Sequence, residues 1–129
     1  MMVDDGAVYI LRNKNFPSHG TGLSLDGEYL ITGSHSGWQA LNVAVLAGAK
    51  TILLLGFDAR APATGQPGHW HGSHPTPTPV AAYVAYRRAF SAGAAAVKAA
   101  GVAVLNCSPG SAIDSFPKMA LEEALRTEV

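Results

Sequence analysis

The sequence predicts an α/β domain in which a mainly parallel sheet is covered by helices. Apolar runs bounded by turn residues alternate with helical patterns, and this alternation is typical of such a sheet. The runs at residues 51–55 and 102–105 are apolar throughout, as strands buried on both faces require. Because 129 residues match the size of one domain rather than two, residues 1–129 are expected to fold as a single unit.

The amino-terminal half is expected to contain three strands and one helix. The predicted strands cover residues 7–11, 29–32 and 51–55, and the predicted helix covers residues 37–47. Within the helix, Trp38, Leu41 and Val45 keep helical spacing. Gly48 suits the left-handed position that follows a helix end, so the helix is expected to stop there.

The carboxyl-terminal half begins with a long connection. Residues 59–79 are rich in Pro, Gly, Thr and His without periodicity, and a loop of this length is more often functional than idle. A long helix over residues 80–100, a strand over residues 102–105 and a short helix from residue 117 to about residue 126 are expected to follow. Tyr83 and Tyr86 lie on the apolar stripe of the long helix and are interpreted as core residues. Gly101 ends that helix, and Pro117 suits the first position of the last one.

Charge and cysteine content narrow the possible partners. Nine Lys and Arg residues balance nine Asp and Glu residues, so no basic excess favours nucleic acid or an anionic membrane surface. No apolar run approaches the roughly 20 residues that span a bilayer, and Asp4 and Asp5 occupy the start of the chain where a signal peptide would be basic. The single Cys107 forms no internal disulfide and is expected to be a small buried residue, which makes a cytoplasmic location the expectation.

Two places in the sequence suit an anionic ligand. The turn at residues 33–37 leads from a strand into a helix, and the free N–H groups and dipole of a helix start favour phosphate or carboxylate. Ser34, Ser36 and Gly37 are therefore candidate ligand contacts. The alternative is that Ser34 or Ser36 only caps the helix. Asp58 follows a buried strand, at the end of the sheet where α/β proteins bind ligands.

A histidine cluster lies in the long loop. His69, His71 and His74 are three of the five histidines of the chain. Imidazole acts as a general base near neutral pH and is a common metal ligand, so the cluster is a candidate catalytic or substrate-contacting group. Solvated loop histidines are the alternative. A metal is less favoured because no second cysteine and no His-rich helix face completes a closed site, although Asp58 could add one ligand. We expect no metal and no other cofactor.

The segments taken in order resemble a known family. The residues that carry the resemblance are Ser36-Gly37, the helix that follows, Gly48-Ala49-Lys50-Thr51-Ile52 and Gly56-Phe57-Asp58. This block resembles that of bacterial sialyltransferases acting on lipo-oligosaccharides. It is equally similar to Rossmann-like domains related to the archaeal hydroxymethylpterin pyrophosphokinase and to flagellin-modification proteins, especially to uncharacterised phage-borne members. Residues 69–74 resemble the aromatic and histidine loop of the family, and residues 104–111 resemble its final strand and turn.

The resemblance, which covers about residues 28–120, implies a small three-layer Rossmann-like domain that binds a nucleotide or nucleotide-sugar. It implies metal-independent transfer from a CMP-sugar donor. Ser36 and Gly37 would contact the phosphate or ribose, and Ser108 and Ser111 would border the nucleotide pocket. His74 would remove the proton from the acceptor hydroxyl.

Two other functions remain open at this stage. Family members carry a first βαβ half ahead of the matching block, and its absence here favours a non-catalytic binding or structural module, such as a phage protein. A pyrophosphokinase-like phosphoryl transferase is the second alternative. Such an enzyme would use Mg²⁺ and would need carboxylates at the pocket to hold the ion. Asp58 is the acidic residue that the sequence places there. The sheet edge left by a missing half also predicts a homo-oligomer, because an unpaired strand invites pairing.

Overall fold

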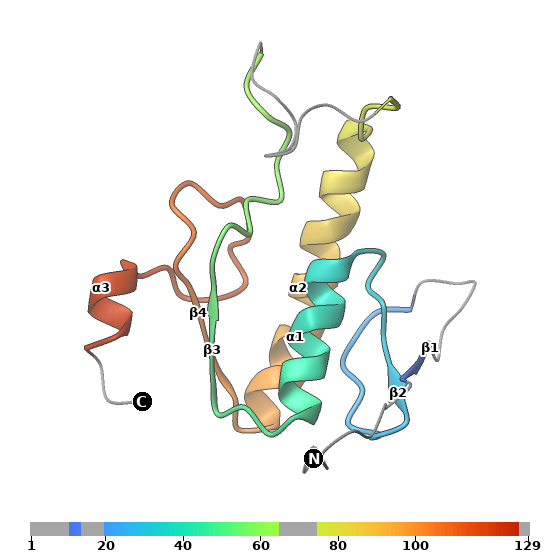
Figure 1. The fold of residues 1–129 in the computed structure, drawn as a ribbon, viewed down its shortest axis with the longest axis vertical. Helices are drawn as coiled ribbons and strands as arrows, with labels where there is room; N and C mark the ends of the chain where they lie inside the picture. The colour runs from blue at the N-terminus through green and yellow to red at the C-terminus, as the bar shows by residue number, and fades with distance from the viewer. Residues whose placement is uncertain (1–10, 14–19, 65–74, 127–129) are drawn as a thin grey trace.

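The computed structural model describes residues 11–13, 20–64 and 75–126, which form a mixed α and β fold (Figure 1). The elements are β1 Arg12–Asn13, β2 Tyr29–Leu30, α1 Ser36–Leu46, β3 Thr51–Leu54, α2 Val80–Ala99, β4 Ala103–Asn106 and α3 Leu121–Ala124. In this part of the chain the strands form two parallel pairs, β1 with β2 and β3 with β4. The parallel pairing and the intervening helices are compatible with the expected α/β class.

Strands β3 and β4 are the parallel strands that the apolar runs predict. The expected burial on both faces is wrong, because only Leu54 of β3 and Val104 and Asn106 of β4 are buried. They pair in register from Thr51 with Ala103 to Leu54 with Asn106. The chain connects them through α2, as parallel strands require a crossover. Pairing extends past the strand ends, because the Cys107 N–H donates to the Leu54 carbonyl at 3.0 Å. The carboxyl ends of β3 and β4 therefore lie at one edge of the sheet.

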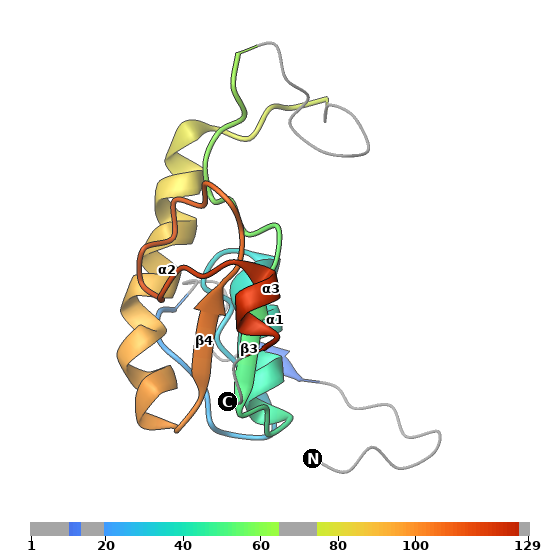
Figure 2. The same cartoon turned by 90° about the vertical axis from the view of Figure 1, so that its left-hand side faces the viewer.

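Strands β1 and β2 form a separate pair on the other side of α1 (Figures 1 and 2). Arg12 and Asn13, which lie just beyond the strand predicted at residues 7–11, form β1 opposite Tyr29 and Leu30. Most of the strand predicted at residues 7–11 lies outside the described residues. Helix α1 contacts both β2 and α2, so it is the element that connects the two sides of the molecule.

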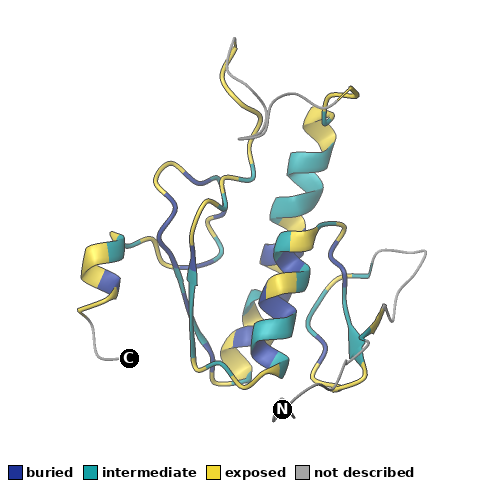
Figure 3. Ribbon diagram, in the orientation of Figure 1, coloured by how far each residue is buried: buried dark blue, intermediate teal, exposed yellow. Residues whose placement is uncertain are grey.

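The two long helices meet around a pair of fully buried aromatic side chains. Trp38 of α1 and Phe90 of α2 are both 0% exposed, and their rings pack edge to face at 5.4 Å. A Cβ atom on Gly93 would collide with the Trp38 ring, so glycine is required where α2 crosses the indole. In Figure 3 the buried segments of α1 and α2 lie in the centre of the molecule, where the two helices overlap in this view.

Helix α2 matches its predicted length closely. Ala89, Phe90, Gly93 and Val97 form its buried side. Gly101 has a φ of +75°, which confirms its role as the helix stop. No helix in the described part of the chain is both long and apolar enough to cross a membrane.

The prediction of a final helix starting at residue 117 is wrong. Residues 117–119 run beside β4 instead: the Pro117 carbonyl accepts from the Asn106 N–H at 2.8 Å, and the Met119 N–H donates to the Asn106 carbonyl at 3.2 Å. Lys118 also forms a parallel β-bridge with Asn106. Hydrogen bonds to the edge of β4 thus override the preference of proline for a helix start, and α3 begins only at Leu121.

Candidate functional site

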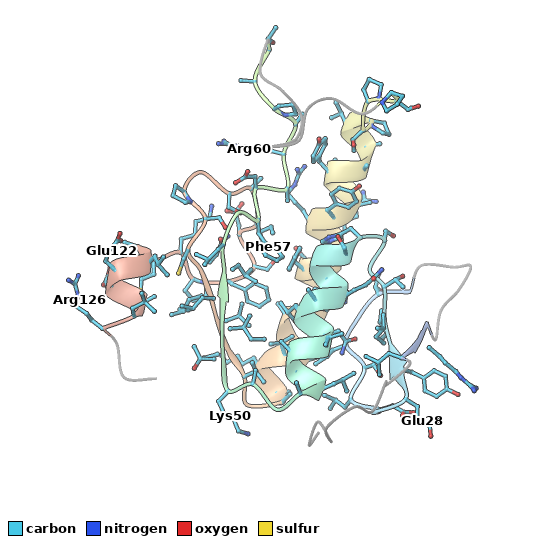
Figure 4. The ribbon with its side chains drawn as sticks, viewed as in Figure 1. Glu28, Lys50, Phe57, Arg60, Glu122 and Arg126 are labelled. Carbon is cyan, nitrogen blue, oxygen red and sulfur yellow. The ribbon has the colours of Figure 1, made fainter. Side chains whose placement is uncertain are left out.

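An open cavity of about 800 Å³ lies at the carboxyl end of β3. Its walls are His35, Ser36 and Gly37 at the start of α1, residues 56–63 after β3, Tyr83, Tyr86 and Phe90 of α2, and Ile113. Figure 4 labels Phe57 and Arg60 on the segment that continues from β3. Parallel α/β sheets bind their ligands in this position, so the cavity is the candidate functional site.

The start of α1 is capped by a histidine rather than by a serine. His35 has the extended backbone of an N-cap (φ −161°, ψ 158°), and its Nδ1 accepts from the Gly37 N–H at 3.1 Å. The alternative that Ser34 or Ser36 caps the helix is therefore wrong. Ser34 is exposed with a φ of +69° and is not part of the cavity wall. Ser36 is the first residue of α1, is exposed and lines the cavity, as we expected of it.

Gly37 is needed for close packing at this helix start. A Cβ atom here would lie 2.9 Å from Cε1 of Phe57 and 3.0 Å from the His35 ring. Its N–H group already donates to His35, so this amide is not free to bind an anion. Gly37 lines the cavity, but the predicted ligand contact through its N–H is replaced by a capping bond.

His35 is held in the neutral form by its surroundings. Its ring lies 4.6 Å from the Tyr86 ring and 5.2 Å from the Phe90 ring. Burial lowers the pKa of His35 below its usual value, and the main chain of Tyr86 offsets only part of this decrease. Because Nδ1 accepts a hydrogen bond, the proton of the neutral ring is on Nε2. Nε2 is buried and forms no hydrogen bond of good geometry among the described residues, although the Tyr86 main chain lies close enough to the ring to favour its charged form.

The segment after β3 brings one acidic residue, Asp58, and one basic residue, Arg60, to the cavity. Asp58 is exposed and lines it, in the position predicted for the end of a buried strand. The backbone here is fixed by two bonds: the Asp58 carbonyl accepts from the Ala112 N–H, and the Ala59 carbonyl accepts from Nη1 of Arg87, both at 2.8 Å. Arg60 is exposed on the cavity wall and lies against Gly110, where a Cβ atom would be 2.6 Å from Nη2.

Ser108 and Ser111 are buried structural residues, each 4% exposed, and neither lines the cavity. Oγ of Ser108 donates to the Leu54 carbonyl and accepts from the Phe57 N–H. Oγ of Ser111 donates to the Phe57 carbonyl at 2.6 Å. The resemblance implies that they border the nucleotide pocket, but they do not line this cavity, because their hydroxyl groups bond to the main chain where β3 ends.

The apolar stripe predicts Tyr83 and Tyr86 as core residues, but both are only half-buried and line the cavity. Their rings pack against each other at 5.8 Å. The signal that could have revealed this is their place in the first turns of α2, directly after the long loop, where the apolar stripe extends beyond the helix-packing core. His69, His71 and His74 lie outside the described residues.

Comparisons of the chain with protein-family models, with curated proteins and with solved structures found no match. Across residues 11–13, 20–64 and 75–126, no group of three or more His, Cys, Asp or Glu side chains is placed to hold a metal ion. The chemistry of the cavity is therefore the basis for assigning a function.

Proposed function

We propose that this protein is a small three-layer Rossmann-like domain that binds a nucleotide or nucleotide-sugar in the cavity at the carboxyl end of β3. The observation that carries the proposal is that the end of a parallel strand and the start of α1 meet at one cavity of about 800 Å³. The first turn of α1 contains no acidic side chain, so the positive end of its dipole is not neutralised locally. A phosphate group beside Ser36 fits this arrangement.

The other walls supply what the rest of a nucleotide needs. Tyr83 and Tyr86 offer aromatic surface to a base. The Arg60 guanidinium suits a second phosphate, and the Asp58 carboxylate can accept hydrogen bonds from sugar hydroxyl groups. These side chains come from two segments on different walls of one cavity, which favours a ligand with chemically distinct parts.

Binding is tested by a thermal-shift panel of CMP, CDP, UDP and ADP together with CMP-linked and UDP-linked sugars. A ligand at 100 times its dissociation constant should stabilise the fold by about 2.7 kcal/mol. Arg60→Ala should weaken binding of the best ligand about tenfold, or roughly 1.4 kcal/mol, whereas Arg88→Ala should not, since Arg88 is exposed away from the cavity. Failure of every nucleotide to stabilise the protein would overturn the proposal.

Catalysis is the second half of the proposal: a metal-independent transfer of a sugar from a CMP donor, with His74 as the base that accepts the proton of the acceptor hydroxyl. His74→Ala should abolish transfer in the presence of a chelator while nucleotide binding is retained. His71→Ala is the matched control and should keep activity. Equal losses in both variants would count against a specific role of His74.

The same assays separate two alternatives. Nucleotide binding without turnover would indicate a non-catalytic binding module, such as a phage structural protein that keeps the fold. Turnover that requires Mg²⁺ would indicate a pyrophosphokinase-like phosphoryl transferase, which the Asp58 carboxylate on the cavity wall favours. With each of these functions we also propose a cytoplasmic location.

A further inference from the structure

His35 connects the cavity wall to the start of α1 through one side chain. It lines the cavity and caps the helix whose first residues form that wall. We propose that His35 is a pH-sensitive switch: its neutral imidazole holds the cavity wall in place, and protonation releases the start of α1 and weakens ligand binding. The binding half of this inference depends on the proposed function, whereas the capping half does not.

Only the neutral ring can form this cap. Nδ1 accepts the Gly37 N–H at 3.1 Å, so its lone pair must be free. A proton on Nδ1 would face the N–H proton directly and would leave two donors opposed. The imidazolium would also lie at the positive end of the α1 dipole, where a cation is unfavourable. Protonation and capping therefore exclude each other.

The ring has little room to adapt. Tyr86 and Phe90 of α2 lie against it, with ring centroids at 4.6 and 5.2 Å. On the helix side, a Cβ atom at Gly37 would already be 3.0 Å from ring atoms, so the space between ring and backbone is filled. A charged ring must therefore turn out toward the open cavity that it lines or displace the first turn of α1.

The groups around His35 offset a positive charge only in part, through the main chain of Tyr86. The charged and titratable groups on the cavity wall are Asp58 and Arg60 from the segment after β3 and Tyr83 and Tyr86 from α2. No salt bridge joins His35 to Asp58 in the part of the chain that the structure describes, and Arg60 carries the same sign as an imidazolium. Arg87, one turn before Phe90, donates to the Ala59 carbonyl.

The direction of the pH effect follows from burial. Desolvation lowers the pKa of His35 from 6.5, so the unfolded chain binds a proton at a higher pH than the folded protein does. The stabilisation that the cap supplies is complete above 6.5 and is lost as the pH falls below that value toward the lowered pKa. By reciprocity, a ligand that requires the capped wall must lower the pKa of His35 further.

The capping half is tested without any ligand. Nitrogen-15 and carbon-13 NMR of the imidazole should show a neutral ring protonated on Nε2 at pH 7.5 and a titration midpoint below 6.5. From pH 7.5 to pH 5.0, the Tm of the wild type should fall by about 4 °C more than that of His35→Asn, because Asn caps a helix without titrating. His71→Asn is the matched control and should follow the wild type.

The binding half uses the best nucleotide of the thermal-shift panel. The Kd of the wild type should rise about fivefold more between pH 7.5 and pH 5.0 than the Kd of His35→Asn, which corrects for protonation of the phosphate itself. A midpoint at or above 6.5, equal pH slopes in both proteins, or tighter wild-type binding in acid would overturn the switch. If no nucleotide binds at any pH while the NMR and Tm results hold, the proposed function fails and the cap titration stands.

Discussion

At the residue scale, Asn42 is the side chain that attaches the amino-terminal segment to α1. It is 0% exposed, and its Oδ1 accepts from the N–H groups of Ser24 and Ile31, both at 3.1 Å. Its Nδ2 donates to the Ser24 carbonyl at 2.8 Å. The buried position of this polar side chain is thus explained by the three main-chain groups to which it forms hydrogen bonds.

We expect Asn42→Leu to lower the free energy of unfolding by about 3 kcal/mol, because the buried Ser24 groups and the partly buried Ile31 N–H lose their partners while the branched shape of the side chain is retained. Urea denaturation followed by circular dichroism measures the loss. Ala40→Ser, on the exposed side of the same helix, should change stability by about 0.5 kcal/mol or less. A loss for Asn42→Leu as small as that of the control would contradict this role.

At the scale of elements, the contact between α1 and α2 depends on the absence of a side chain at Gly93. A Cβ atom there would occupy the space of the Trp38 ring, which also packs on Phe90 and donates from Nε1 to the Gly22 carbonyl at 2.9 Å. Trp38 is therefore held on several sides and cannot move aside without breaking other contacts. Close helix packing, rather than backbone freedom, explains this glycine in the interior of α2.

Gly93→Ala should destabilise the protein by about 1–3 kcal/mol through overpacking against Trp38. The sign of the change in the free energy of unfolding is informative, because Ala is favoured over Gly by about 1 kcal/mol inside a helix where space is open. Urea denaturation together with tryptophan fluorescence gives both the stability and the state of the indole. Ala92→Ser, exposed on the same turn, should have little effect. A more stable Gly93→Ala variant would show that the two helices are not packed as described.

At the scale of the whole molecule, the outer edge of β3 has no partner among the described strands, since β3 pairs with β4 alone. Leu55, the residue directly after β3, is 53% exposed. An unpaired parallel edge next to an exposed leucine favours pairing with a second copy of the chain. The expected homo-oligomer thus remains a prediction with a defined surface.

Sedimentation velocity at micromolar concentration should show a dimer or a larger assembly. Leu55→Lys should shift the protein toward monomer, because a charge beside an edge strand opposes pairing. Val80→Lys is the matched control: Val80 is 70% exposed at the start of α2, away from that edge, and this variant should remain associated. A wild-type monomer at every concentration tested would refute the prediction.

The sequence alone determined the elements whose signals are local. Continuous apolar runs predicted β3 and β4, helical spacing predicted α1 and α2, and Gly48 and Gly101 marked the helix ends, where their φ angles are +87° and +75°. These signals suffice because hydrophobic periodicity and glycine conformation act over a few neighbouring residues. The positions of Ser36 and Asp58 beside the cavity followed from the same order of elements.

The details of the candidate site depend on contacts between segments that are far apart in the sequence. Capping by His35 depends on a ring held by Tyr86 and Phe90, more than 50 residues away along the chain, and Ser108 supports β3 through a hydrogen bond to Phe57 across 51 positions. The segment at residues 117–119 became extended because the edge of β4 supplied hydrogen bonds that no local pattern contains. Side-chain partners of this kind are set when distant segments pack together, since a hydrogen-bonding group takes the partner that the fold places within reach.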